Sequence, residues 1–524
     1  MSFLENNDST IIIGGGIAGL TAALHLAERG LQPRLLEAHP KFIGGRIAGG
    51  ETVILDHAGQ TWHFRQEHGV HGIWNPYVNL KATLARHNLT PDFIPALEES
   101  WLYKHGNRLS ITPAGSLIRY SWVAAPLHYL MLFLHPRFLN ALGLDDWVTL
   151  IHAWGGILYG LGVDPLAEDQ PLDGQTLADF TARWSPALRA FVVGLTRNGM
   201  AAPPEEVPLS GFLAFLRFYT LLRRDNWQFS YLPTDGGTGL AEPMMNTIIG
   251  LGGTLQLNTR VTHLELCPDG WRIYTQTGDG TPEPLTSPHV VLATDSPAAR
   301  RILTQSTPLA THAKQLHFPR GMASVVIRIW FDIVPNPTSE AGMFSGDFVL
   351  HNYFWLHRIQ EQYRAWNRAA GGSCIEVHIY GPQPLLNEPD ATLLARAIAD
   401  VQTVFPELRG HRLHQTIQRN EATHTLFGLG PPDKHLGIRT PWPGLYCAGD
   451  WVRHPTPAFF LERAALTGLE AANAVLSDRG QPPFPVQSYP PPEPFAAFIE
   501  KLMRKGRTRK KNRTRISQIG SDFR

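Results

Sequence analysis

The chain has 524 residues, of which 43% are hydrophobic and 17% charged, and its formal net charge is +1. This length exceeds one ordinary domain and indicates two, while the near-neutral charge gives no reason to expect a specific nucleic-acid partner. The three cysteines, Cys267, Cys374 and Cys447, form no CxxC pair, so we expect no disulfide framework. Glu5 and Asp8 stand where a signal peptide would be basic and then apolar, so we expect a cytoplasmic protein.

The N-terminal region combines elements in the order strand, glycine turn, helix, strand and acid. A β-branched run at Thr10–Ile13 predicts the first strand, and apolar periodicity predicts a helix over Ile17–Arg29. A second short strand, Arg34–Leu36, ends on Glu37. This order is the context in which a glycine motif signals dinucleotide binding.

The turn itself has the GxGxxG spacing at Gly14, Gly16 and Gly19. The first glycine permits a tight turn, the second lets backbone N–H groups approach a pyrophosphate, and the third lets the helix pack closely on the sheet. Glu37 lies 18 residues past Gly19, where a carboxylate can accept hydrogen bonds from ribose hydroxyls. The motif therefore predicts a dinucleotide, and it leaves NAD and FAD open.

A second glycine pair follows the acid. After Glu37 and Ala38 comes Gly44-Gly45-Arg46. This spacing resembles the large flavoprotein family of amine oxidases and carotenoid desaturases, in which the GGR segment lies along the FAD diphosphate. The resemblance implies FAD as the cofactor, and a planar guanidinium suits phosphate. The cofactor residues expected in this region are Gly14, Gly16, Ile17, Ala18, Gly19, Glu37, Ala38, Gly44, Gly45 and Arg46.

Rossmann-type pieces recur twice more along the chain. One contains a glycine turn, a helix and a predicted strand ending on Val261, followed by a strand at Val290–Asp295. The resemblance places the Val261 backbone at the adenine edge. We therefore expect an α/β, Rossmann-like FAD-binding domain built from three segments, with an interleaved α+β substrate domain. The expected boundaries are 1–74, 235–303 and 435–480 for the FAD-binding domain, 75–234 and 304–434 for the substrate domain, and 481–524 for a Pro-rich linker and basic tail.

The third piece begins with a strand that runs into Gly449-Asp450. Thr456-Pro457 then predicts a helix N-cap with proline in the first turn, and so a helix over Ala458–Leu476. In the family that the chain resembles, this motif wraps the FAD ribityl chain and its acid bonds to it. The resemblance thus adds Gly449, Asp450, Pro457 and Ala458 to the cofactor residues.

Three further segments resemble carotenoid desaturases: His68–Leu80, Gly371–Pro382 and His454–Gly468. Within the last, Leu461–Ala464 reads LERA, which is similar to the ζ-carotene-desaturase and isorenieratene-synthase branch. The resemblance implies an apolar, polyene-like substrate, with quinone or oxygen as the electron acceptor.

Four histidines, His57, His63, His68 and His71, lie within 15 residues, but they form no HExxH pair. We therefore expect no metal site. The sequence shows no Ser/His/Asp or paired-carboxylate constellation either. His68, His71 and Arg463 are candidates for a catalytic role by position only, alongside the simpler interpretation that they are structural.

Long apolar runs mark the substrate region. Val123–Leu134 and Phe212–Leu222 are rich in aromatic residues, and Trp147–Val163 has no formal charge. These runs suggest an apolar tunnel, or simply a large helical core. The run at Trp147–Val163 is short for a membrane span, so a buried helix and a helix inserted in one leaflet both remain open.

The C-terminus is basic. Nine Lys/Arg and no Asp/Glu lie in Lys501–Arg515, after seven prolines in Pro482–Pro494. We expect a disordered tail behind a linker. Contact with anionic lipid, contact with nucleic acid and a merely solvated tail remain open.

The predicted reaction depends on what the chain lacks. The resemblance places the lysine of amine oxidases on a strand that corresponds to Gly321–Phe331, which contains no lysine; the nearest is Lys314. This favours a desaturase that removes hydride from an apolar chain to form a C=C bond. An amine or protoporphyrinogen oxidase, a redox-silent isomerase and a flavin-bound scaffold are the alternatives.

Overall fold

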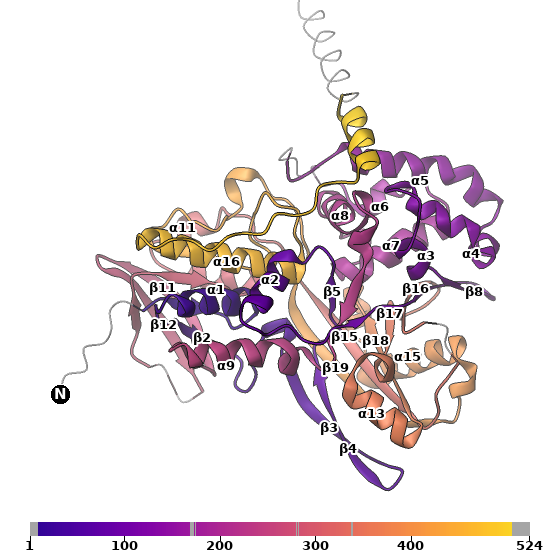
Figure 1. The fold of residues 1–524 in the computed structure, drawn as a ribbon, viewed down its shortest axis with the longest axis horizontal. Coiled ribbons are helices and arrows are strands. Elements are labelled where there is room, and N and C mark those ends of the chain that lie inside the picture. The colour runs from indigo at the N-terminus through magenta and orange to yellow at the C-terminus, as the bar shows by residue number, and fades with distance from the viewer. Residues whose placement is uncertain are drawn as a thin grey trace, which may run out of the picture.

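In the computed structural model, a five-stranded parallel sheet gathers strands from three distant parts of the chain (Figure 1). The structure describes residues 9–505 except 168–171, 173, 279, 281, 337 and 338. All neighbours in the sheet are parallel. In spatial order the strands are β10 Thr254–Gln256, β2 Arg34–Leu36, β1 Ile11–Ile13, β14 Val290–Leu292 and β20 Leu445–Cys447.

Helices pack on this sheet and complete the α/β architecture. α1 (Ile17–Glu28) lies beside α16 (Phe460–Asp478) and α9 (Glu242–Gly250) (Figure 1). At the crossing of α1 and α16, a Cβ on Gly468 would lie 2.3 Å from the Ala18 carbonyl oxygen, so only glycine allows this approach. The Rossmann-like fold class is confirmed, while the domain boundaries stay predictions.

A seven-stranded mixed sheet forms the second large element. Its core side is covered by α15 (Asp390–Val404), whose apolar side chains pack with those of the strands. α13 (Glu361–Ala370) lies near α15 (Figure 1). Beyond the other end of the sheet in Figure 1 lie α3 (Gly115–Arg119), α4 (Pro136–Ala141), α5 (Leu144–Gly162), α6 (Leu177–Phe180), α7 (Pro186–Met200) and α8 (Leu209–Leu216). In spatial order the strands are β19 Arg412–Thr425, β15 Gly321–Phe331, β18 Ser373–Ile379, β17 Asn352–Trp355, β16 Ala341–Gly346, β7 Glu99–His105 and β8 Arg108–Pro113.

Smaller sheets connect the two large ones. A hairpin of β3 (Gly49–His57) and β4 (Gln60–Glu67) delivers Glu67 to the larger sheet, where its carbonyl accepts a hydrogen bond from Arg328. β9 (Phe229–Tyr231) lies between β5 (Gly72–Trp74) and β6 (Ile94–Pro95). The remaining antiparallel sheet contains β11 (Thr259–Cys267), β12 (Gly270–Thr277) and β13 (Leu285–Ser287).

The predicted strand ending on Val261 is wrong in its bounds. β10 ends at Gln256, and Val261 lies near the start of β11 in another sheet. The break between them is a turn in which Asn258 has φ +52°, a left-handed conformation that no strand residue adopts.

The predicted start of the C-terminal helix is also wrong. α16 begins at Phe460, not at Ala458, and Thr456 caps nothing. The guanidinium of Arg463 donates to the carbonyls of Val452, Thr456 and Ala458, which holds this stretch as a loop ahead of the helix.

α5 (Leu144–Gly162) contains the uncharged run, and it is not a buried core helix. Leu144, Val148 and Ile151 are 87%, 75% and 73% exposed, and their spacing places them on one face. No helix in the described part of the chain is long and apolar enough to cross a bilayer.

The C-terminal region packs more closely than the linker prediction implies. Phe484 is buried and its carbonyl accepts from Asn473, while Gln487 donates its backbone N–H to Asn79. Residues 494–505 are helical, so the predicted disorder is wrong for 501–505. The rest of the predicted tail lies outside the described residues.

Candidate active site

The glycine turn after β1 is shaped as a dinucleotide cradle. Gly14 has φ +106°, and a Cβ there would lie 2.7 Å from the carbonyl oxygen of Ala293. A Cβ on Gly19 would lie 1.9 Å from the carbonyl oxygen of Gly14. No side chain caps the N-terminus of α1, where Gly16 is the N-cap. Its first N–H groups are therefore free to bind a diphosphate.

The second glycine pair closes this cradle. The Gly44 N–H donates to the Gly15 carbonyl at 2.9 Å, and Gly44 has φ +123°. Gly45 also has positive φ, and the pair forms a tight turn beside Gly16. Arg46 follows at once, so its cation lies next to the expected diphosphate.

Glu37 lies at the end of β2, at the edge of the cradle. Its carboxylate accepts from the backbone N–H of Gly15 at 2.8 Å and of His39 at 2.7 Å. These bonds fix the orientation of the carboxylate. It lines the cavity together with Ala38 and Val261, as a ribose-binding acid would.

The three segments meet at Asp450. Its Oδ2 lies 2.7 Å from the Arg46 guanidinium, and its Oδ1 accepts from the Thr425 hydroxyl at 2.8 Å. Gly449, with φ +140°, donates its N–H to Thr467 in α16. Because Asp450 is buried, Arg46 is the charge that compensates it in this arrangement.

One cavity of about 1350 Å³ runs from this cradle into the rest of the protein. A single ligand pocket spans ~300–1,000 Å³, so this cavity has room for a cofactor and a second ligand. Gly19, Pro457 and Ala458 do not line it. The expected cofactor residues that do are Gly14, Gly16, Ile17, Ala18, Glu37, Ala38, Gly44, Gly45, Arg46, Val261, Gly449 and Asp450.

Sequence reasoning missed other residues of the cradle. Three residues that were not predicted, Asp295, Thr259 and Arg260, line the cavity. In the chain, Asp295 only follows a strand, and Thr259 and Arg260 only begin one. At the start of α16 the lining residues are Phe460, Leu461 and Ala464 instead of Pro457 and Ala458. Phe460 has φ +48°, which an L-residue adopts only where its surroundings impose it.

The far part of the cavity is aromatic. Trp74 contacts Trp227 and Phe229, with ring centroids 4.8 and 4.4 Å apart. Phe215 and Tyr219 lie beside Phe460. All of these rings line the cavity. Such a wall binds an extended apolar ligand by its ring faces.

Two of the four clustered histidines reach the cavity. His68 and His71 line it, and burial lowers the pKa of His71 to about 4 and that of His68 well below its usual value. Both are therefore neutral at pH 7. His57 and His63 lie on the β3–β4 hairpin, and the described residues contain no group of three potential metal ligands.

Arg463 does not line the cavity. It is fully buried, and its guanidinium lies 4.7 Å from the centroid of the Phe427 ring while it donates to the three backbone carbonyls named above. Its contacts are those of a residue that shapes the loop before α16.

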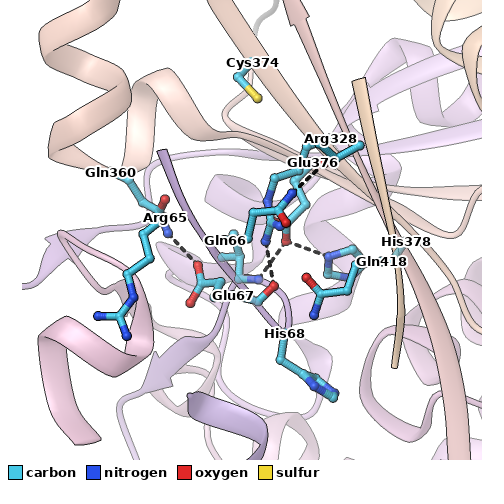
Figure 2. Close-up of polar contacts among 12 residues, drawn as sticks. Arg65, Gln66, Glu67, His68, Arg328, Gln360, Cys374, Glu376, His378 and Gln418 are labelled. Carbon is cyan, nitrogen blue, oxygen red and sulfur yellow. Dashed lines mark hydrogen bonds and ion pairs between the residues drawn. The ribbon is translucent and has the colours of Figure 1, made fainter. Parts of the chain in front are cut away.

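A buried ionic network beside the cavity was not expected from the sequence. Figure 2 shows Glu376 between Arg328 and His378, with Glu67 nearby. Glu376 Oε2 lies 2.6 Å from Arg328, and Oε1 accepts from His378 at 2.7 Å. Glu67 accepts from Gln360 at 2.5 Å and from the Gly236 N–H at 2.9 Å. The prediction from the sequence that the chain has no paired-carboxylate constellation is therefore wrong.

A signal for this network was present in the sequence. Glu376 and His378 alternate along β18 and Tyr380 follows its last residue in the same alternation, so the sequence indicates that Glu376 and His378 share one face of the strand. The resemblance of Gly371–Pro382 to carotenoid desaturases does not by itself indicate this alternation.

Comparison with known proteins agrees with this geometry. The model of the family "Flavin containing amine oxidoreductase" matches residues 135–476, and that of the "NAD(P)-binding Rossmann-like domain" matches residues 12–86. The first match covers well over half of the chain. The chain belongs to the flavin-containing amine oxidoreductase family.

Relatives include a carotenoid phi-ring synthase of Streptomyces griseus, 28% identical over 91% of this chain and 89% of that one. A 15-cis-phytoene desaturase of Narcissus pseudonarcissus is 23% identical over 90% of this chain and 80% of that one. Among solved structures, cyclohexylamine oxidase from Brevibacterium oxydans shares the fold, with a TM-score of 0.63 and 16% identity over 91% of this chain and 100% of that one.

Membership of this family establishes an FAD-dependent oxidoreductase, and the residues present fit its cofactor. The open N-terminus of α1 and the turn at Gly44 would hold the diphosphate, and Glu37 would hold the adenosine ribose. Asp450, in the third segment, would hold the ribityl chain. When bound, FAD supplies a two-electron acceptor for hydride.

Proposed function

We propose that this protein is an FAD-dependent desaturase that removes hydride from a carotenoid-like polyene to form a C=C bond. The observation that carries the proposal is the aromatic cavity that continues from the dinucleotide cradle. Ring faces stabilise positive charge on a hydrocarbon chain, as hydride removal requires. The names of the relatives, carotenoid phi-ring synthase and phytoene desaturase, support a carotenoid substrate.

Amine oxidation is the second candidate, since the matching family model describes amine oxidoreductases and cyclohexylamine oxidase is one of the solved structures with this fold. The chain lacks the lysine that amine oxidases are expected to carry on the strand corresponding to β15, because none of the eleven residues of β15 is a lysine. The cation on this strand, Arg328, is paired with a buried carboxylate and so is not free to act on a substrate.

The proposed desaturase activity is tested in the absence of oxygen. Purified protein mixed with a carotene in detergent micelles should lose its flavin absorbance, and a quinone analogue or oxygen should restore it. Mass spectrometry should show a product two hydrogen atoms lighter. Bleaching by amines but not by carotenes would contradict the proposal, as would a product of unchanged mass, which would indicate an isomerase.

The substrate's insolubility in water makes a membrane contact part of this proposal. The apolar face of α5, formed by Leu144, Val148 and Ile151, is solvent-exposed. Trp122 is 79% exposed as well. The C-terminal helix reaches α5, because a Cβ on Gly162 would lie 2.8 Å from Met503. This contact places Lys501, Arg504 and Lys505 near the C-terminal end of α5, where their charges would add an electrostatic attraction to anionic lipid.

Acidic substitutions on α5 test this contact. We expect the double variant Val148→Asp/Ile151→Asp to bind anionic phospholipid vesicles at least ~10²-fold more weakly, because each buried aliphatic side chain contributes ~1.5–3 kcal/mol. Vesicle sedimentation measures the change. Ile249→Asp, at an exposed site on α9, is the matched control. Equal binding by all three proteins would exclude α5 as the membrane contact.

A further inference from the structure

Forming a C=C bond breaks two C–H bonds, and the two hydrogens leave the substrate in different forms. The inference rests on the function proposed above. One hydrogen leaves with its electron pair as hydride, which the flavin accepts. The other leaves as a proton, and its bonding pair becomes the new C=C bond. Among the described residues, no carboxylate is hydrogen-bonded to the ring of His68 or His71, so neither imidazole has the hydrogen-bonded counter-charge that a proton acceptor needs here.

Tyr380 follows the last residue of β18 and lines the cavity, as do His378 and Glu67 of the buried network. Its hydroxyl lies 2.6 Å from His378 Nδ1 and accepts from the Asn352 amide at 3.2 Å. The carboxylate of Glu376 can only accept, so His378 carries its proton on Nε2 and leaves Nδ1 free to accept. The hydroxyl proton of Tyr380 therefore points at His378.

Glu376 is ionised and fixed in position. Burial raises its pKa, but the Arg328 charge 2.6 Å away outweighs burial and holds the pKa well below its usual value. Its Oε1 also accepts from the Val70 N–H at 2.7 Å. Burial, together with the Glu376 charge, raises the pKa of Glu67, so this pair carries one negative charge at pH 7.

Gly69 allows His378 to lie in this position. A Cβ on Gly69 would lie 3.0 Å from His378 Cε1, and Gly69 has φ +149°. The imidazole is thus held between a backbone without a side chain and the Glu376 carboxylate. The order carboxylate, imidazole, hydroxyl matches the arrangement by which hydrolases move a proton at a hydroxyl.

We propose that Tyr380, His378 and Glu376 form a proton relay that receives the proton lost by the substrate. Tyr380 Oη takes the proton from carbon while its own proton passes to His378 Nδ1. The positive charge of the substrate thereby moves to the imidazolium, which Glu376 stabilises. Because burial raises the pKa of Tyr380, both protons move together and no free phenolate forms. Tyr380 is the catalytic residue, and His378 and Glu376 are positioning residues.

The test compares Tyr380→Phe with wild type in the carotene assay, at matched FAD content. We expect kcat to fall ~10²–10⁴-fold, the usual contribution of general base catalysis, while KM stays unchanged. Glu376→Gln, which keeps the shape but removes the charge, should lower kcat with KM unchanged and FAD retained. A merely structural role would change KM or FAD content instead.

Tyr353→Phe is the matched control. Tyr353 is a buried tyrosine on the neighbouring strand β17, bonded to Ser339 and absent from the cavity lining. Its loss should leave kcat unchanged. If wild type desaturates carotene and Tyr380→Phe does so at the same rate, the relay is refuted while the proposed function stands. If wild type oxidises only amines, both are refuted.

Discussion

Gly19→Ala is expected to leave the protein without bound FAD. The added Cβ would lie 1.9 Å from the Gly14 carbonyl oxygen, so the glycine turn must move away from the helix. Each lost hydrogen bond to a charged phosphate costs ~1.5–3 kcal/mol, and losing two raises the Kd by ~10²–10⁴-fold. Fluorescence titration of the apoprotein with FAD measures the change.

Gly250→Ala is the control for this variant. Gly250 ends α9, has no positive φ, and a Cβ there would meet nothing within 4 Å. Its FAD affinity should equal that of wild type. Circular dichroism separates loss of FAD from loss of the fold. Wild-type affinity in a folded Gly19→Ala variant would show that this turn does not form the cradle.

The second large effect is expected on stability. Arg328→Met should lower the free energy of unfolding by ~3–5 kcal/mol, because it leaves the Glu376 carboxylate buried without its counter-charge. Arg328 and Glu376 are 2% and 0% exposed at their side chains. Urea unfolding followed by tryptophan fluorescence measures the loss.

Two further variants make this result specific. Arg364→Met breaks an exposed pair with Glu361 and should cost less than ~1 kcal/mol. The double variant Arg328→Met/Glu376→Met removes both buried charges and should regain part of the stability lost by Arg328→Met. An Arg328→Met protein as stable as the Arg364→Met protein would contradict the buried-pair argument.

The dinucleotide cradle was predictable because its information is local. Gly14, Gly16, Gly19 and Glu37 lie within 24 residues, and each has a backbone reason to be where it is. Short apolar runs predicted the strands of the parallel sheet, and β1, β2, β14 and β20 lie within the predicted strands. The resemblance to flavoproteins then led to FAD.

The buried ionic network was harder to predict because its parts come from different strands. Arg328 and Glu376 become neighbours only through the pairing of β15 with β18. The predicted start of α16 was wrong for a similar reason. Thr456-Pro457 is a strong local signal for a helix start, but the side chain of Arg463 donates hydrogen bonds to the carbonyls of that loop. Tertiary contacts outweighed local preference in both places.

The exposure of α5 also could not be predicted from the amino-acid composition of that segment. The run at Trp147–Val163 has the apolar content of a core helix, and nothing local shows which face a neighbour covers. Only the packed structure shows that no element among the described residues covers Val148 and Ile151.

The most direct test of the account is whether three distant segments bind one FAD. The purified protein, reconstituted with FAD and freed of excess by gel filtration, should be yellow and carry one FAD per chain, and Asp450→Ala should weaken that binding. A wild-type protein that stays colourless after incubation with FAD would contradict the fold-to-function argument at its base.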